Sequence, residues 1–281
     1  MDFSVNTYTF KARVKQKITF AFASDLHNRA TGAILRAIRE SEADALLIGG
    51  DLIHEADEYQ NGFAFLSAAS RHLPVFLSIG NHDRRFRGDL VGCLTDCGAT
   101  VLDNRSVLFG GVRLGGLSSA FLKWGAQDES KTKDYTPDLS FLCEYSTMPE
   151  YKLLLCHHPE YYERYIRALR IDLTLAGHAH GGQWRFFGRG VFAPGQGLFP
   201  RYTSGLYEHR LLVSRGMVNA AKGIPRINNR PELLIVRLIP ENKNASEEKG
   251  TSNGHARITY VHPSLSRVPI ALDNFLPIVM N

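Results

Sequence analysis

The sequence has few cysteines and no apolar run long enough to cross a membrane. Only four cysteines occur in 281 residues, which is too few and too scattered for a disulfide framework. The longest apolar stretches, such as Ile18–Ala23, fall far short of the ~20 residues that a membrane-spanning helix needs. Residues 1–10 lack the basic start, the apolar run and the cleavage site of a secretory signal. We therefore expect a cytoplasmic protein whose thiols are reduced.

Clusters of one charge sign and nucleotide-binding loops are also missing. Lys and Arg number 33 against 28 Asp and Glu, which gives a formal net charge of +5 at pH 7. Such an excess can favour nucleic acid, a membrane surface or an anionic substrate. The basic residues form no short patch typical of a nucleic-acid groove. Neither a Walker A loop nor a dinucleotide fingerprint occurs, so we expect no nucleotide cofactor.

Short apolar runs alternate with helical patterns along the chain. Runs at 17–23, 45–48 and 75–79 are typical of strands, and helical spacing of apolar residues occupies 31–41 and 59–73. This alternation predicts parallel strands with helical crossovers. The second half is richer in strands. Residues 100–117 are expected to be β-rich, with hairpins at the glycine pairs 110–111 and 115–116. Further strands are expected at 151–156, 173–176 and 233–238, and a helix is expected at 160–169.

Composition divides the chain into three parts. Residues 1–240 are expected to form the folded domain. Residues 241–257 are polar and poor in apolar side chains, which predicts a flexible linker. Residues 258–281 are apolar again, and we expect this tail to dock on the core. An oligomer contact and a membrane-surface contact are the alternative roles for the tail.

Histidine, aspartate and asparagine recur where the predicted strands end. In an open α/β sheet, ligands bind at the carboxyl ends of the strands, and no packing requirement explains such a recurrence. The residues at these five strand ends are Asp25, His27, Asp51, Asn81, His82, His157, His178 and His180. The remaining histidines are interpreted as ordinary hydrogen-bonded or surface residues, apart from His158, and they are His54, His72, His209, His255 and His262.

The types of these side chains indicate a pair of metal ions. Carboxylates, imidazoles and an amide oxygen suit the divalent ions of Mn, Fe, Co, Ni and Zn. A structural zinc site would be rich in cysteine, and no cysteine lies among these residues. Eight positions are too many for one tetrahedral ion. They suit two ions about 3.5–4 Å apart that share a carboxylate and a bridging hydroxide.

The ordered set of motifs resembles the calcineurin-like metallophosphoesterase superfamily over residues 17–240. Its blocks are Asp25-Leu26-His27, Gly49-Gly50-Asp51, Gly80-Asn81-His82-Asp83, His157 and Gly177-His178-Ala179-His180. The resemblance implies a four-layer αββα sandwich with two mixed β-sheets. Motifs after His180 resemble the bacterial branch typified by YkuE, and they include Gly181-Gly182-Gln183, Val213-Ser214-Arg215-Gly216 and Pro231-Glu232.

The resemblance also implies a role for each residue of these motifs. Asp25, His27 and His180 would hold one metal ion, and Asn81, His157 and His178 would hold the other. Asp51 would bridge the two ions. His82 would contact the phosphate and protonate the leaving oxygen without binding metal. His158 is the alternative to His157. Substrate contacts are assigned more weakly to Asn28, Arg29 and Arg84, since charged loop side chains are as often merely solvated.

The implied function is that of a metal-dependent phosphoric ester hydrolase. It would cleave phosphomonoester, phosphodiester or pyrophosphate bonds of a small substrate by in-line attack of a metal-bridging hydroxide. Mn, Fe, Zn or Ni would serve, with manganese expected in vitro. The alternatives are a nuclease of the same superfamily, a membrane-peripheral pyrophosphatase of the UDP-diacylglucosamine type, and a non-catalytic scaffold. The net charge and the apolar tail also leave open a weak contact with anionic lipid.

Overall fold

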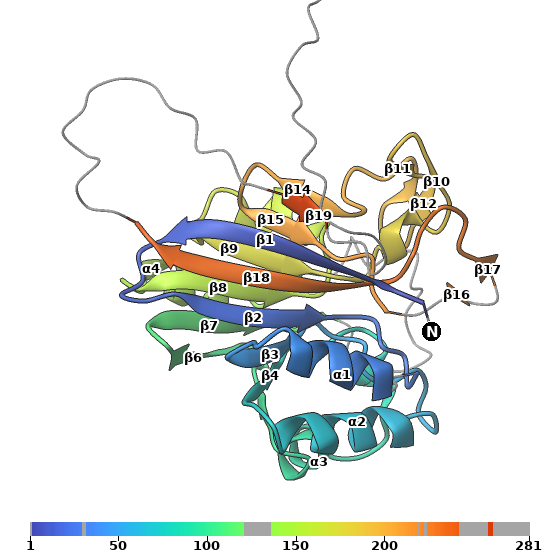
Figure 1. Cartoon of the computed structure of the whole chain (residues 1–281), viewed down its shortest axis with the longest axis horizontal. Helices are drawn as coiled ribbons and strands as arrows, with labels where there is room; N and C mark the ends of the chain where they lie inside the picture. The colour runs from blue at the N-terminus through green and yellow to red at the C-terminus, as the bar shows by residue number, and fades with distance from the viewer. Residues whose placement is uncertain are drawn as a thin grey trace, which may run out of the picture.

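The computed structural model describes residues 2–29, 32–120, 136–217, 220–221, 224–241 and 258–260. Two mixed β-sheets pack against each other in this part of the chain (Figure 1). The larger sheet contains, in spatial order, β19 (Ile258–Tyr260), β1 (Ser4–Ala12), β18 (Glu232–Pro240), β2 (Ile18–Ala23), β3 (Ala45–Ile48), β4 (Val75–Leu77) and β5 (Ala99–Val101). The smaller sheet contains β14 (Gly205–Tyr207), β15 (Leu211–Val213), β9 (Leu173–Ala176), β8 (Tyr151–Cys156), β7 (Val112–Leu117) and β6 (Arg105–Phe109).

Helices cover the outer face of each sheet. The larger sheet packs against α1 (Gly32–Glu40), α2 (Gln60–Ser70) and α3 (Leu90–Asp96). The smaller sheet packs against α4 (Leu139–Thr147) and a π-helical segment, Tyr162–Ile166. The predicted four-layer αββα sandwich with two mixed sheets is therefore confirmed.

Alternate residues of the central strands face different layers. On β2, Phe20 and Phe22 pack between the sheets, whereas Ala21 and Ala23 face the helices. On β8, Leu155 faces the larger sheet and Leu154 faces the outer helical layer. Side chains alternate across a strand, so a strand that is buried on both faces reads as a continuous apolar run. This burial explains why these strands were predictable from the sequence.

Some elements differ from the predictions. The apolar–polar pattern did not indicate β1, whose inward side chains include the polar Asn6. The pair 110–111 does connect β6 and β7, with φ values of 56° and 83°. The pair 115–116 lies inside β7 instead, so the hairpin predicted there is wrong. A Cβ on Gly116 would lie 2.2 Å from the carbonyl oxygen of Leu102, so close packing rather than a turn requires glycine.

The remaining predictions meet the structure only in part. The predicted helix at 160–169 is the shorter π-helical segment Tyr162–Ile166. All four cysteines are free. No helix among the described residues combines the length and the apolarity needed to cross a membrane. β19 pairs antiparallel with β1. Residues 242–257 and 261–281 lie outside the described residues, so the linker and the docking of the tail stay predictions.

Candidate metal centre

The predicted ligands lie in five loops that leave the carboxyl ends of central strands. Asp25 and His27 follow β2, Asp51 follows β3, and Asn81 follows β4 in the larger sheet. From the smaller sheet, His157 follows β8, and His178 and His180 follow β9. Every one of these residues is at most 5% exposed. The packing of the two sheets therefore brings polar groups that are distant in sequence into one buried region.

The backbone of this region is held in an unusual conformation. Five of the predicted ligands have positive φ values, at Asp25 (53°), His27 (43°), Asp51 (55°), His178 (64°) and His180 (47°). Non-glycine residues seldom adopt the left-handed region, and each such residue costs about 1–3 kcal/mol. Hydrogen bonds between the loops hold the conformation, since the N–H of Asp25 donates to Gly50 O (3.0 Å) and that of His27 donates to Asp51 O (2.9 Å). A strained backbone in a buried polar cluster is typical of a functional site.

Among the described residues, four groups of three side chains have ligand atoms within 4.8 Å of one another, and two of these groups consist of predicted ligands alone. In the first group, Asp25, His27 and His180, the distance from His180 Nε2 to Asp25 Oδ1 is 3.6 Å. The Asp25 carboxylate is oriented by Ser24 Oγ (2.6 Å) and by the backbone N–H of His178 (3.0 Å), which both donate to it. Asp25 is thus fixed by the two loops that also carry the other ligands.

The second group consists of Asp51, His157 and His178. Asp51 Oδ2 lies 3.2 Å from His157 Nε2 and 3.6 Å from His27 Nε2, a member of the first group. The other oxygen, Oδ1, accepts the backbone N–H of His82 at 2.8 Å. His157 Nδ1 lies 2.8 Å from the carbonyl oxygen of Gly49, which makes Nδ1 the donor. One oxygen of Asp51 therefore lies between imidazoles of both groups.

Six predicted ligands have a buried polar atom with no hydrogen-bond partner. These atoms are His27 Nε2, Asp51 Oδ2, Asn81 Oδ1, His157 Nε2, His178 Nε2 and His180 Nδ1. Buried polar atoms are almost always satisfied, because an unsatisfied one costs about 1–3 kcal/mol. Cations held by the two groups would satisfy these atoms, of which Asp51 Oδ2 and His157 Nε2 otherwise lie against each other (3.2 Å). The donor set therefore fits a metal ion. Histidines buried by chance would not leave so many ligand atoms without a hydrogen-bond partner.

Electrostatics in the cluster follow from burial and from the two carboxylates. Burial lowers the pKa of His27 and of His178 well below the ordinary value and lowers that of His180 to about 4. Burial opposes the charge on His157 as well, but the carboxylate of Asp51 outweighs it and raises the pKa of His157 to about 10. A cation competes with that proton for the charge of Asp51. Most of these imidazoles are thus held in the neutral form that binds metal.

Asp83 supports the cluster, although the sequence assigned it no separate role. Its Oδ2 accepts the backbone N–H groups of Asp51 (2.8 Å) and Gly80 (2.9 Å), and its Oδ1 accepts that of Ile53 (3.1 Å). Burial and the charge of Asp51 raise the pKa of Asp83 to about 6, so the carboxylate is ionised at neutral pH. Asp83 therefore ties the loop after β3 to the loop after β4.

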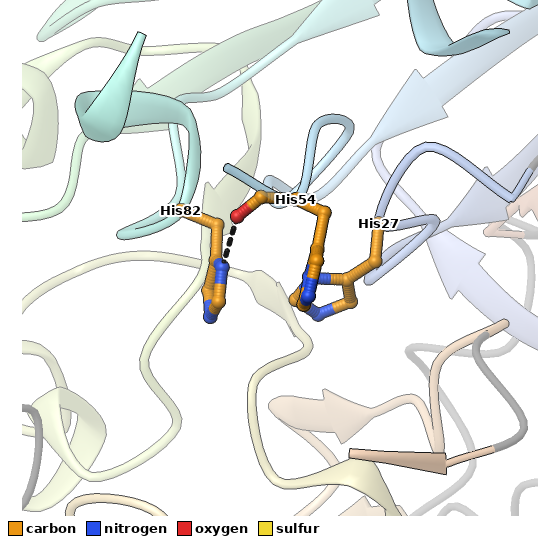
Figure 2. Close-up of side chains that lie close together, drawn as sticks. All are labelled: His27, His54 and His82. Carbon is orange, nitrogen blue, oxygen red and sulfur yellow. Dashed lines mark hydrogen bonds between the residues drawn. The ribbon is translucent and has the colours of Figure 1, made fainter. Parts of the chain in front are cut away.

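His54 lies in the same region, although it was interpreted as an ordinary histidine. Figure 2 shows His54 beside His27 and His82. Its ring nitrogen Nδ1 lies 3.1 Å from Nδ1 of His27, and its carbonyl oxygen lies 2.5 Å from Nδ1 of His82. The position of His54, three residues after Asp51, was the signal that could have indicated this placement.

The weaker substrate assignments find different surroundings. Asn28 Oδ1 accepts the backbone N–H of Gly62 (2.9 Å), which orders the start of α2. Arg84 forms an ion pair with Asp103 (3.1 Å). Arg29 is exposed, and its charge is one of the smaller influences that lower the pKa of His54. The structure does not bring these three side chains together with the ligand groups, and their roles stay predictions.

His158 has a hydrogen-bond partner on one ring nitrogen and a carboxylate near the other. Its Nε2 lies 2.8 Å from Ser119 Oγ, and its Nδ1 lies 3.3 Å from Glu160 Oε1. Glu160 Oε1 in turn lies 3.9 Å from His178 Nε2. His157, by contrast, turns Nε2 toward Asp51. This difference favours His157 over His158 as the ligand. His158 instead lies next to His178, and Glu160 is close to both imidazoles.

Comparison with known proteins agrees with this geometry. A family model described as calcineurin-like phosphoesterase matches residues 18–182, which include all the predicted ligands. The chain belongs to this family. Phosphodiesterase YaeI of Escherichia coli K12 is 32% identical over 236 residues, which cover 78% of this chain and 81% of that protein. The metallophosphoesterase YkuE of Bacillus subtilis 168 is 27% identical, with 73% of this chain and 71% of that protein covered.

Another family member comes from Helicobacter pylori J99 and is described as an uncharacterized metallophosphoesterase. It is 30% identical over 218 residues, which cover 75% of this chain but 55% of that protein. The chain thus spans about half the length of its Helicobacter relatives.

Replacement of Asp83 by asparagine should weaken metal binding. The substitution keeps the shape but turns one acceptor into a donor that faces a backbone N–H, which loosens the loops carrying Asp51 and Asn81. We expect Mn²⁺ affinity, measured by calorimetric titration, to fall roughly ten- to a hundredfold, as is usual for groups that orient ligands.

Asp89→Asn is the matched control, because Asp89 Oδ1 also accepts a backbone N–H (from Gly92, 2.9 Å) but lies at the exposed start of α3. An equal loss of affinity in both variants would contradict the positioning role of Asp83.

Proposed function

We propose that the chain is a dinuclear-metal-dependent phosphoesterase that uses the two ligand groups as two adjacent cation sites. The observation that carries this proposal is the set of six buried, unpartnered donor atoms in five loops. Asp25, His27 and His180 would hold one ion, and Asn81, His157 and His178 would hold the other. Asp51 is the proposed bridge, because its Oδ2 is close to an imidazole of each group.

Two divalent cations held there would supply an activated water for in-line attack and would offset the negative charge of the phosphate. Imidazole, carboxylate and amide ligands accept Mn, Fe, Zn or Ni, and we propose manganese for activity in vitro. The substrate is proposed to be a small phosphate ester. The description of the Escherichia coli relative as a phosphodiesterase favours a diester.

His82 is proposed to donate a proton to the leaving oxygen. A carbonyl oxygen only accepts hydrogen bonds, so the contact with His54 O keeps a hydrogen on Nδ1 of His82. The proton that His82 can exchange is therefore on Nε2. The backbone N–H of His82 donates to Asp51 Oδ1, and the imidazole of His82 lies close to that of His27 (Figure 2).

Arg226 is a further group that we place at this site, and sequence reasoning missed it. Its Nη2 donates to the carbonyl of Arg215 (2.6 Å), whereas Nε and Nη1 are buried without a partner. Burial lowers the pKa of Arg226 to about 10 against the opposing charge of Asp25, so the side chain is charged at neutral pH. Its charge also contributes to the lowered pKa of His180. We propose that Arg226 binds non-bridging oxygens of the substrate phosphate.

The activity itself is tested with purified, Mn²⁺-loaded protein. We expect hydrolysis of bis-p-nitrophenyl phosphate, less of p-nitrophenyl phosphate, and none after chelation of the metal. UDP-sugar pyrophosphates and single-stranded DNA test the pyrophosphatase and nuclease alternatives. Protein that binds two metal ions and hydrolyses none of these substrates would be a non-catalytic scaffold.

His82→Ala should keep both metal ions and lose most turnover. General-acid assistance is typically worth about 10²–10⁴-fold, so kcat should fall by that order on an ester with a poor leaving group. The loss should be much smaller on a nitrophenyl ester, whose leaving group needs no proton. His72→Ala, an exposed histidine, is the control. Unchanged rates on the poor leaving group would refute the role of His82.

Arg226→Gln should raise KM more than it lowers kcat. A hydrogen bond to a charged group is worth about 1.5–3 kcal/mol, which corresponds to roughly ten- to a hundredfold in affinity. Arg226→Lys should recover part of the loss, because the charge returns without the planar fork. The control is Arg230→Gln, whose side chain is 59% exposed. A fall in metal content instead of a rise in KM would show that Arg226 only balances Asp25.

A further inference from the structure

Exposed apolar side chains are concentrated in one region of the molecule. Of the ten large hydrophobic side chains that are exposed among the described residues, seven lie between Trp184 and Ile227. They are Trp184, Phe186, Phe187, Phe192, Leu198, Phe199 and Ile227. Scattered exposed apolar residues need no explanation, but a concentration of this kind marks an interaction surface.

All of these side chains except Ile227 are carried by two short hairpins or lie directly beside their strands, and we call these hairpins the aromatic platform. The first hairpin pairs β10 (Arg185–Phe186) with β11 (Arg189–Gly190), and the second pairs β12 (Phe192–Ala193) with β13 (Gly197–Leu198). The hairpins are connected, because the N–H of Val191 donates to Trp184 O (2.9 Å) and that of Phe199 donates to Val191 O (2.8 Å). Figure 1 shows β10, β11 and β12 outside the two sheets.

Two phenylalanines of the platform occupy positions that suit a smaller residue. Phe187 and Phe199 are 105% and 82% exposed. Both have a positive φ, 49° and 53°, in the left-handed region that glycine or asparagine adopts more easily. Neither packing nor turn geometry explains an aromatic ring at these positions. An external apolar partner does explain it.

The charge of this segment points to the kind of partner. Residues 177–207, which contain the platform, carry three arginines and no Asp or Glu. Residues 173–231 contain eight Lys or Arg and a single acidic residue, Glu208. The sequence of the segment thus has a net charge of +7, although Arg201, Arg215 and Arg230 form ion pairs with acidic residues outside it (Glu163, Glu232 and Asp2). Arg189 lies directly opposite Phe186 in the first hairpin, which places a cation beside an exposed ring.

We infer that the aromatic platform docks on the surface of an anionic lipid membrane. Aromatic side chains prefer the interface between water and hydrocarbon, and arginines close to them bind anionic headgroups. The exposed rings lie on hairpins rather than along a groove, so they suit insertion between lipids better than recognition of a peptide. The contact would hold the metal centre near the membrane, because β10 begins five residues after His180.

The platform is anchored to the ligand loop. A Cβ on Gly182 would lie 2.4 Å from the Cα of Gly190. Asn229 Nδ2 also donates to the carbonyl of His180 (2.8 Å) and to that of Gln183 (3.0 Å). This inference concerns a surface outside the ligand groups and does not depend on the proposed reaction.

Vesicle binding by the full chain tests the inference. We expect co-sedimentation with vesicles of phosphatidylcholine and phosphatidylglycerol at low salt, and little with phosphatidylcholine alone. The double variant Phe187→Asn/Phe199→Asn should lose roughly tenfold or more of the partition coefficient, since two apolar anchors are removed. Asparagine tolerates the left-handed backbone, so the fold and the hydrolysis of a water-soluble ester should not change.

A spectroscopic measurement and a matched control complete the test. In a Trp124→Phe background, Trp184 is the only tryptophan, and its emission should shift to the blue when anionic vesicles are added. Leu108→Thr is the control, because Leu108 is 55% exposed on β6, in a different part of the chain. The inference is overturned if the double variant binds vesicles as well as the unmodified chain. It is also overturned if the chain does not bind vesicles but self-associates in sedimentation experiments, and if this self-association requires the two phenylalanines.

Discussion

The buried carboxylate of Asp51 connects the two halves of the molecule. It follows β3 of the larger sheet, and its Oδ2 lies 3.2 Å from Nε2 of His157, which follows β8 of the smaller sheet. His27 and the backbone of His82 approach the same carboxylate from two further loops. Burial opposes ionisation, but the charge of His157, followed by that of His82, holds the pKa of Asp51 well below its usual range. A buried charge is costly unless it is compensated, and here imidazoles from two loops lie close to the carboxylate while its Oδ2 makes no hydrogen bond.

The close approach of these loops accounts for the glycines of the motifs. A Cβ on Gly80 would lie 2.2 Å from Oδ1 of Asp51, and one on Gly50 would lie 2.7 Å from Nδ1 of His157. Gly50 also has a φ of 90°, which side chains disfavour. The motif glycines are therefore required at these positions for steric reasons. Their lack of a side chain leaves room for the predicted ligands that approach each other from the two sheets.

The segment after β9 combines three roles in one stretch of chain. It contains two predicted ligands, then the aromatic platform, and then returns to place Asn229 against the loop of His180 and to bring in Arg226, the proposed phosphate-binding group. Gly216 lies in the same segment, where a Cβ would come within 2.8 Å of Asp25. The positive charge of the chain is concentrated here, so the overall excess of Lys and Arg has a local explanation. Substrate binding and the proposed membrane contact would share this one basic region.

The local sequence determined which strands are buried and which polar residues follow them. Buried strands and their ends could be predicted from continuous apolar runs that are followed by Asp, Asn or His, because strand burial and strand ends depend on residues that are neighbours in the sequence. The four-layer fold came from the resemblance that these ordered motifs carry. β1 escaped notice because its inward face includes Asn6, which is bonded to Glu232 on the parallel neighbour β18.

Only the tertiary structure decided which other residues surround the predicted ligands. Asp83 accepts backbone N–H groups from a different loop, and Arg226 lies in a segment that returns after two more strands of the smaller sheet and several short hairpin strands. His54 is near Asp51 in sequence, but its contacts with His27 and His82 require three loops to meet. Such contacts depend on how the two sheets pack and how their loops cross. Periodicity and motif spacing describe a single strand and its loop, so they contain no information about these contacts.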